Sequence, residues 1–414
     1  MYFSHLGRTM NLRVSFMALV ATLAVAFFAT DVVNAAPSSS FSQWVDDFAA
    51  QAEANGINRR FYFSVFEGVT QEDASVLEKA AYQPEFTTPL WEYLDTRINS
   101  LTVRAGLEKK DHYRDALQAI EKRYGVPREV LLAIWSVETK YGEVLLNNKR
   151  LHYVPQALAT LAWGDSKRTS FARSQLLAAL KIMRDDKIGN DKMYGSWAGA
   201  MGQTQFIPTS YLAYAVDGDG DGRRDIWDSA ADALASSANL LSKNGWQRGE
   251  RWGIEIAFNK SLMNWNGQSK SLSAWRKIGL IKADGAPLPE SQAMAELKLP
   301  AGLDGPAFLV CKNFAVIKRY NNSDTYALTV LLLSDQLAGR PSPKTPWRRP
   351  PDSLTFLERR EMQQLLTARN LYHGEADGSF GDGSRAALQA FEQQRGLPVT
   401  GRPTQNLLKA LRGQ

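Results

Sequence analysis

The chain has 414 residues, which is enough for two or three domains. Hydrophobic residues make up 44% of it and aromatic residues 10%, so it can bury real cores and is not a disordered protein. Lysine and arginine number 49 against 43 acidic residues, and the net charge of +6 favours an anionic partner. The sequence lacks the basic blocks of nucleic-acid-binding tails, so no nucleic acid partner is expected. The single Cys311 excludes intrachain disulfides, and the four histidines form no HxxH or HExxH motif, which argues against a zinc hydrolase.

The first 36 residues are typical of an export signal. Arg8 and Arg13 precede an uncharged apolar stretch at 14–30, and residues 33–35 fit a signal-peptidase cleavage pattern. A membrane anchor is the alternative, but spanning a bilayer takes about 20 apolar residues. We therefore expect a cleaved signal peptide at 1–36 and a soluble mature protein without an integral membrane span. Export without disulfides fits the bacterial periplasm, where the cell-wall polymer is the obvious partner.

Prolines divide the rest of the chain. Five of the 17 prolines fall within residues 341–351, a composition that no helix or central strand accepts. We expect a semi-rigid linker at 341–353, which separates a large domain at 37–340 from a small domain at 354–414.

The large domain is predicted to be mainly helical. Apolar residues at helical spacing predict helices at 41–55, 114–124, 130–137, 170–183 and 230–241. Pro127 indicates the start of the third of these helices. Short strands are predicted at 253–258, at 308–311 and at 314–317. The expected fold class is α-rich α+β.

Glu138 has an unusual place in one of these helices. Leu131, Ile134 and Glu138 lie at i, i+3 and i+7, so the carboxylate shares the buried face. Gly142 indicates the helix end, which puts Glu138 in the last turns, where the helix dipole disfavours a carboxylate. Burial would raise its pKa toward the neutral value that a general acid needs. The alternatives are a salt bridge from Glu138 to Lys140 or Arg150, or a misjudged helix face, and periodicity alone leaves all of these open.

Five segments of the large domain carry recognisable motifs. They are VETKYG at 137–142, LATLA at 158–162, SWAGAMGQTQFIPTS at 196–210, the aspartate-rich run at 211–227, and the segment 313–326 that contains RYNNSDTY. In this order they resemble the lytic murein transglycosylase B family in its soluble form. The match covers nearly all of the large domain, and five ordered motifs are highly specific.

The resemblance implies a lysozyme-like catalytic domain with a small inserted β-sheet, which cleaves peptidoglycan glycan strands. Glu138 would protonate the oxygen of the β-1,4 bond between N-acetylmuramic acid and N-acetylglucosamine, and would then act as base on the muramic 6-hydroxyl. That hydroxyl attacks its own C1, so the product has a 1,6-anhydro end and no water is consumed. Ordinary glycosidases need a second carboxylate, which an internal nucleophile makes dispensable. A hydrolytic muramidase and a non-catalytic peptidoglycan-binding protein remain the alternatives, and association with other cell-wall enzymes would suit the same substrate.

The resemblance also implies residues that bind the glycan. They are Ser196, Gln205, Tyr320, Asn321, Tyr326 and, on a looser match, Tyr93. Without the resemblance, Ser196 and Gln205 would be interpreted as turn or helix-cap residues, and Tyr320 with Asn321 as a strand-end turn.

A calcium-binding loop is predicted at 217–228, which overlaps the aspartate-rich run. The expected ligands are the side chains of Asp217, Asp219, Asp221, Asp225 and Asp228 and the main-chain carbonyl of Arg223. Their spacing follows the EF-hand loop, with glycine at its sixth position, and hard oxygen ligands suit Ca²⁺. Asp228 stands where glutamate is usual, and two arginines lower the negative charge of the loop. An ion-free turn is therefore the alternative to a structural Ca²⁺.

The C-terminal domain carries a motif of its own. The run GEADGSFG at 374–381 follows the apolar residues Leu365, Leu366 and Leu371, and it precedes apolar residues at helical spacing within 386–397 and 407–411. This pattern predicts three short helices around a small core and resembles the peptidoglycan-binding domain type 1. Ser384 and Glu392 are mild departures from that family's pattern, and no residue here is assigned as a ligand contact.

Overall fold

The structure is a computed structural model that describes residues 39–81, 89–146, 151–257 and 259–413. The predicted signal peptide at 1–36 lies outside these residues. Within the described ranges, no helix has both the length and the apolar character needed to cross a bilayer.

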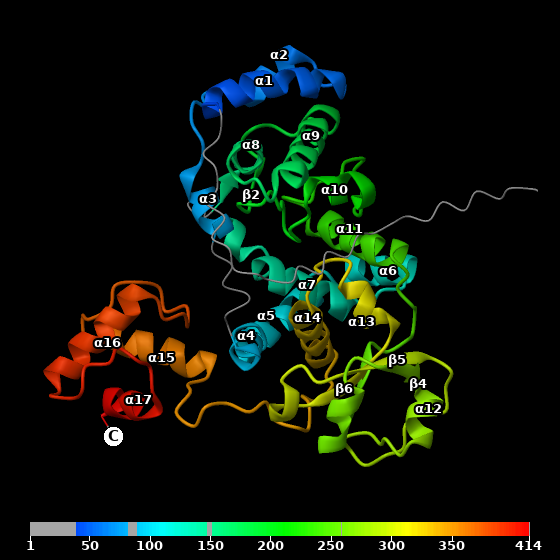
Figure 1. The fold of residues 1–414 in the computed structure, drawn as a ribbon, viewed down its shortest axis with the longest axis vertical. Helices are drawn as coiled ribbons and strands as arrows, with labels where there is room; N and C mark the ends of the chain where they lie inside the picture. Colours follow the sequence, from blue (N-terminus) through cyan, green and yellow to red (C-terminus); the bar gives the residue numbers. More distant parts are fainter. Residues whose placement is uncertain (1–38, 82–88, 147–150, 258, 414) are drawn as a thin grey trace, which may run out of the picture. The chain divides into compact units, whose positions relative to one another are not determined.

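Helices make up most of the body (Figure 1). In chain order they are α1 (Phe41–Ala54), α2 (Arg59–Val65), α3 (Ala74–Ala81), α4 (Leu90–Arg97), α5 (Ser100–His112), α6 (Arg114–Tyr124), α7 (Arg128–Thr139), α8 (Val154–Gly164), α9 (Thr169–Asp185), α10 (Pro208–Tyr214), α11 (Ala230–Lys243), α12 (Leu272–Lys277), α13 (Lys312–Ile317) and α14 (Asp324–Leu337). All five predicted helices are present as α1, α6, α7, α9 and α11, with ends that differ from the predictions by at most two residues.

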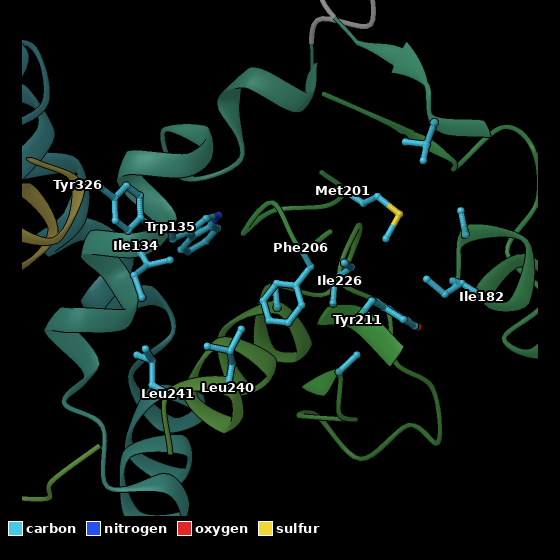
Figure 2. Packing of buried hydrophobic residues seen from close by; sticks show 14 of the residues in the cluster. Ile134, Trp135, Ile182, Met201, Phe206, Tyr211, Ile226, Leu240, Leu241 and Tyr326 are labelled. Carbon is cyan, nitrogen blue, oxygen red and sulfur yellow. The ribbon is translucent and has the colours of Figure 1, made fainter. Parts of the chain in front are cut away.

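The helix α7 is central to the body and packs against α5, α6, α11 and α14. Every residue from Val130 to Ser136 is buried, because the sequence VLLAIWS has almost no polar face. In Figure 2, Ile134 and Trp135 of α7 lie beside Tyr326 of α14, while Leu240 and Leu241 of α11 pack below them. Glu138 therefore projects from a helix that packing on several sides holds in place.

The end of α7 differs from the prediction. The helix stops at Thr139 rather than near Gly142, because Lys140 and Tyr141 both adopt left-handed backbone, with φ of 50° and 59°. Such a conformation costs a residue with a side chain roughly 1–2 kcal/mol. The buried Tyr141 offsets part of this cost, since its hydroxyl donates a hydrogen bond to the Thr102 carbonyl at 3.2 Å. Glu138 consequently lies in the last turn of the helix.

Two small antiparallel sheets complete the body. One pairs β1 (His152–Tyr153) with β2 (Tyr194–Gly195). The other has the strand order β3-β6-β5-β4, formed by β3 (Gly253–Ile256), β4 (Ser269–Ser271), β5 (Met294–Lys298) and β6 (Ala307–Val310). It has its own core around Trp275, Leu297 and Leu309.

The strand predictions are confirmed in part. The segments 253–258 and 308–311 correspond to β3 and β6, although residue 258 lies outside the described residues. The strand predicted at 314–317 is wrong, since these residues belong to α13. The buried residues of α13 are Asn313, Phe314, Val316 and Ile317. The apolar run 314–317 is too short for its sequence alone to distinguish a helix from a strand.

The C-terminal helices are α15 (Phe356–Thr367), α16 (Asp382–Gln394) and α17 (Gln405–Arg412), as predicted. They enclose a separate core that includes Met362, Leu366, Leu388, Phe391 and Leu408. Thr355 and Glu358 form a capping box at the start of α15, in which each side chain accepts a hydrogen bond from the other's backbone N–H.

The segment 341–353 contains no helix or strand, as its prolines require. It is not a free spacer, however, because it packs along the body. The Trp347 ring stacks on Phe308 with centroids 6.4 Å apart. The N–H groups of Lys344 and Thr345 each donate a hydrogen bond of 2.8 Å to the Glu255 carboxylate.

Candidate active site

Glu138 faces the N-terminal turn of α14. Its Oε1 accepts a hydrogen bond of 2.5 Å from the hydroxyl of Tyr326, which is 3% exposed. Ser323 caps α14 and accepts a hydrogen bond from the Tyr326 N–H at 3.2 Å, so the helix start fixes this tyrosine. The pairing joins residues 188 positions apart in the chain.

Burial raises the pKa of Glu138 from 4.5 to about 7. The hydrogen bond from Tyr326 and the positive charge of Arg97 act in the opposite direction, but they do not cancel the effect of burial. The side chain nevertheless keeps partial contact with solvent. At neutral pH the carboxyl group is thus protonated in a large fraction of molecules, and because Tyr326 occupies Oε1, the proton is expected on Oε2.

A second tyrosine supports the first. The rings of Tyr320 and Tyr326 stack with centroids 6.4 Å apart and planes at 10°. The Tyr320 hydroxyl donates to the Thr204 carbonyl at 2.5 Å and lies 3.2 Å from the Ser237 hydroxyl oxygen. Burial raises the pKa of each tyrosine well above 10, so both remain neutral hydrogen-bond donors at physiological pH.

The helix α4 brings Tyr93 and Arg97 to the same place. The Arg97 guanidinium lies 3.6 Å from the centroid of the Tyr93 ring, and α4 packs against α14. Tyr93 is close enough to raise the pKa of Tyr326, and Arg97 is close enough to lower that of Glu138. Arg97 is not predictable from the sequence motifs, since none of them connects this helix with Glu138.

The loop of the third motif hydrogen-bonds to the end of α7 and to Tyr320, which precedes α14. The Thr139 hydroxyl donates to the Gln203 carbonyl at 2.5 Å, and the next carbonyl, that of Thr204, accepts the bond from Tyr320. Gly199 of this loop has φ of 85°, and a Cβ atom there would lie 2.7 Å from the Leu158 side chain. Four of the five motifs therefore meet around Glu138 and the loop beside it.

Three of the predicted glycan-binding residues lie on the periphery of this arrangement. Ser196 accepts a hydrogen bond from the Ala200 N–H at 3.0 Å, which is a local turn. Gln205 has left-handed backbone with φ of 53°, and its amide donates to the Gly202 carbonyl at 2.9 Å. Asn321 is exposed. In the described part of the chain, none of these three side chains hydrogen-bonds Glu138, whereas Tyr326 does. The strained backbone of Gln205 is of the kind that clusters at functional sites.

A cluster of carboxylates lies in the predicted calcium loop. It contains Asp217, Asp219, Asp221 and Asp232, with one carboxylate oxygen from each within 4.8 Å of all the others. Asp232 was not among the predicted ligands, because this residue follows the 12-residue template and lies in the first turn of α11. It is buried, and its carboxylate accepts hydrogen bonds from the N–H groups of Gly218, Asp219 and Asp225.

The remaining predicted ligands lie elsewhere. Asp228 is exposed and forms an ion pair with Lys192 at 2.5 Å. The Asp225 carboxylate accepts the N–H groups of Trp227 and Asp228, and Arg223 donates its own N–H to Asp221. The structure thus brings together three of the five predicted carboxylates and adds a fourth.

This donor set fits a hard cation. Four carboxylates supply only oxygen atoms, which suit Ca²⁺ or Mg²⁺ rather than a transition metal. Backbone N–H groups of Gly222 and Gly220 lower the pKa of Asp217, so this carboxylate is ionised at neutral pH. Burial raises the pKa of Asp232. The positive charge of a bound cation would lower this pKa again.

Comparison with known proteins identifies the family. Residues 40–335 match the transglycosylase SLT domain profile, and residues 357–411 match a peptidoglycan binding domain. The chain belongs to the transglycosylase SLT domain family. It is 34% identical over 239 residues to membrane-bound lytic murein transglycosylase B of Escherichia coli K12, an alignment that covers 57% of this chain and 64% of the relative.

Solved structures of the family agree. SltB3 from Pseudomonas aeruginosa in complex with NAG-anhNAM-pentapeptide is 43% identical, covers 90% of this chain and 100% of its own, and gives a TM-score of 0.69. The Escherichia coli lytic transglycosylase SLT35 in complex with calcium is 29% identical, covers 72% and 92% of the two chains, and gives a TM-score of 0.61. The predicted family, the lysozyme-like α-rich fold and the C-terminal peptidoglycan-binding domain are confirmed.

Proposed function

We propose that the protein is a lytic transglycosylase that cleaves the β-1,4 bond between N-acetylmuramic acid and N-acetylglucosamine in peptidoglycan and leaves 1,6-anhydro ends. The observation that carries the proposal is the environment of Glu138, a carboxyl group with a pKa near 7 that is held by Tyr326. Membership of an enzyme family of this kind supports it, as does the NAG-anhNAM-pentapeptide bound by the Pseudomonas aeruginosa relative.

In the first step Glu138 acts as general acid. The protonated Oε2 donates its proton to the glycosidic oxygen as the bond to C1 of N-acetylmuramic acid breaks. Tyr326 remains hydrogen-bonded to Oε1 and stabilises the carboxylate that forms. The oxygen leaves as the 4-hydroxyl of N-acetylglucosamine, and positive charge develops at C1.

In the second step Glu138 acts as general base. The carboxylate removes the proton from the muramic 6-hydroxyl, whose oxygen attacks C1 and closes the anhydro ring. Proton and electron pairs balance over the two steps, and the acid is restored without water. Burial, the Tyr326 hydroxyl and the Arg97 charge are the causes of the shifted pKa of Glu138, and among the described residues no carboxylate contributes to that shift. A hydrolytic mechanism with two carboxylates is therefore less well supported.

Other parts of the site would hold the glycan. Tyr320 and Tyr326 supply a stacked pair of rings beside the acid, and Tyr93 supplies a third ring on α4. We assign glycan contacts to these three tyrosines, and also to Ser196, Gln205 and Asn321 on the loops around them. Aromatic faces and short polar side chains are the usual means of binding a sugar chain in a cleft.

The products test the function. Purified sacculi treated with the protein are expected to release fragments with anhydro-muramic ends, which mass spectrometry distinguishes from hydrolysed ends by the mass of one water molecule. Reducing ends would instead indicate a muramidase, and the absence of fragments a protein that only binds the wall.

The proposed function also assigns a role to each domain of the chain and a location to the protein in the cell. We assign catalysis to residues 37–340, a linker to 341–353 and attachment to the wall to 354–414. Export by a signal peptide at 1–36 would deliver the protein to the periplasm, where it would take part in remodelling and turnover of the cell wall.

We also propose that the carboxylate cluster binds a structural Ca²⁺. The oxygen donors of Asp217, Asp219, Asp221 and Asp232 support it, as does the calcium found in the Escherichia coli relative SLT35. When bound, the ion would supply positive charge that offsets four neighbouring carboxylates. These residues would hold the loop that connects α10 to α11, and α11 in turn places Ser237 next to Tyr320.

Calcium is expected to raise the melting temperature by several degrees, and a chelator to lower it. A ligand that binds only the folded state at about 100 times its Kd stabilises it by about 2.7 kcal/mol. Asp217→Ala combined with Asp221→Ala should remove this shift, as differential scanning calorimetry would measure. Mg²⁺ should have little effect, because it requires a tight octahedral site.

Asp228→Ala is the matched control for this cluster. It removes a carboxylate that the EF-hand template includes and the cluster omits. The calcium-dependent shift should survive in this variant. Its loss in Asp228→Ala as well as in the double variant would indicate the template loop, which contains Asp217, Asp221 and Asp228, rather than the cluster.

A further inference from the structure

Two lysines from different elements hold the first residue of α14. The Nζ of Lys298, the last residue of β5, lies 2.8 Å from Oδ2 of Asp324. The Nζ of Lys318, which directly follows α13, lies 2.7 Å from Oδ1 of the same carboxylate. Lys298 also forms an ion pair of 2.8 Å with Glu296 of β5. These four charges form a network that connects the larger sheet and the end of α13 to the start of α14.

The network is partly shielded from solvent. The side chains of Lys298, Lys318 and Asp324 are 22%, 31% and 44% exposed. Burial alone would raise the pKa of Asp324, but the interactions with the two lysines outweigh burial and lower that pKa. A single ion pair on a surface contributes little, whereas several charges joined in a network contribute more. Asp324 is therefore ionised at neutral pH and is held on both carboxylate oxygens.

Asp324 precedes Tyr326 by two residues in the first turn of α14. The first N–H groups of a helix have no partner within the helix, and helix ends fray unless other groups hold them. Here the Ser323 cap holds the backbone, and the two lysines hold the side chain of Asp324. The two residues before Ser323 are exposed, so the turn gains little from packing on that side. The direction of the Tyr326 hydroxyl toward Glu138 thus depends on groups outside the active site.

The pKa of Glu138 reports on this direction. Burial raises that pKa, while the hydrogen bond from Tyr326 and the charge of Arg97 lower it. The other titratable groups that act on this pair are Tyr320, beside α14, and Tyr93 of α4. Loss of the Tyr326 hydrogen bond would leave only Arg97 to oppose burial, so the pKa of Glu138 would rise above its present value of about 7.

We propose that Lys298, Lys318 and Asp324 are positioning residues, whose ion pairs fix the first turn of α14 and thereby direct the Tyr326 hydroxyl to Glu138. They act through Tyr326 and not on the glycan. The inserted sheet then has a role in the reaction, because Lys298 at the end of β5 supplies one of the two contacts. The consequence for cleavage rests on the proposed function, whereas the positioning itself rests on the ion pairs.

Carbon-13 NMR on the full chain, with labelled glutamate carboxyl groups, measures the titration of Glu138 without any substrate. Its signal is assigned by its absence in Glu138→Gln. Asp324→Asn is expected to move the titration midpoint upward by about one pH unit, because a charge-assisted hydrogen bond is weakened. Removal of a negative charge would by itself move the midpoint downward. The sign of the shift therefore separates positioning from direct electrostatics.

Two further variants test whether the effect passes through Tyr326. Lys298→Met combined with Lys318→Met should also raise the midpoint, since it removes the same ion pairs from the other side. Tyr326→Phe should raise it as well. Tyr326→Phe added to Asp324→Asn should give no larger shift than Tyr326→Phe alone, because both changes remove one contact. Additive shifts would overturn the proposal.

Lys312→Met is the matched control. Lys312 is exposed and lines the same hollow of about 220 Å³ as Lys298 and Lys318, but it forms no ion pair with any residue that the structure describes. Its replacement should leave the midpoint unchanged. A downward or absent shift in Asp324→Asn, or an equal shift in Lys312→Met and the lysine double variant, would overturn the proposal.

Activity gives a separate readout. The release of anhydro ends at pH 7 should fall about tenfold in Asp324→Asn, because a small misplacement near the reacting groups is costly, and should not change in Lys312→Met. If the unchanged protein releases no anhydro ends, the proposed function fails, whereas the titration of Glu138 still decides the positioning. The two failures are therefore distinguishable.

Discussion

Glu138→Gln is expected to abolish release of anhydro-ended fragments from sacculi, while the protein still folds and binds them. Glutamine keeps the size and a carbonyl oxygen for the Tyr326 hydroxyl, but it has no proton to donate to the glycosidic oxygen and is no base for the 6-hydroxyl. Loss of a general acid or base typically costs 10²–10⁴ in rate, and here one residue performs both tasks. Chromatography of the released fragments measures the rate, and co-sedimentation with sacculi measures binding.

Glu143→Gln is the appropriate control for this substitution. Glu143 follows α7 by a few residues and has the same chemistry, but it is exposed and lies outside the group around Tyr326. We expect this variant to turn over at the unchanged rate. Turnover near the normal rate in Glu138→Gln would mean that another residue supplies the proton, and the mechanism would then be wrong.

Local sequence patterns predicted the elements of the site better than they predicted its partners. Periodicity placed Glu138 on the buried face of a helix, and the structure has Leu131 and Ile134 fully buried on that helix. No local pattern connects Glu138 with Tyr326, because the hydrogen bond joins residues 188 positions apart. That pairing came only from the resemblance of the fifth motif to a known family.

Local sequence patterns also fail to predict contacts between distant residues in the calcium loop, in α13 and in the segment 341–353. The EF-hand template spans 12 residues and so does not reach Asp232, which the start of α11 brings back to the loop. The four apolar residues 314–317 are too few to show whether their period is that of a strand or of a helix. In the structure they belong to α13, which packs against α14. The prolines of 341–353 predicted an irregular segment correctly, but not that Trp347 would stack on Phe308.

The raised pKa of Glu138 also has a consequence for stability. In the unfolded chain this carboxyl group titrates near 4.5, whereas in the folded protein burial raises its pKa to about 7. The folded state therefore holds its proton more tightly between these values, and stability falls as the pH rises through them. Below pH 4.5 the Glu138 carboxyl group is protonated in both the folded and the unfolded state, so its titration costs no stability there. Above pH 7 both are ionised, and the difference of about 2.5 pH units corresponds to roughly 3 kcal/mol of lost stability.

Glu138→Gln should accordingly be more stable than the unchanged protein at pH 8, by as much as about 3 kcal/mol, with the gap closing near pH 4.5. The amide is neutral at every pH, and its oxygen still accepts the Tyr326 hydroxyl, so only the cost of a buried negative charge disappears. Urea denaturation at several pH values between 4.5 and 8 measures the gap, and the exposed Glu143→Gln should show none. A gap that does not change with pH would mean that glutamine merely packs better. A destabilised Glu138→Gln at pH 8 would mean that the carboxylate is stabilised in the folded protein, and that its pKa is not raised. The same buried carboxyl group that serves as the acid near pH 7 thus makes the folded protein less stable, which is the trade expected of a residue retained for catalysis.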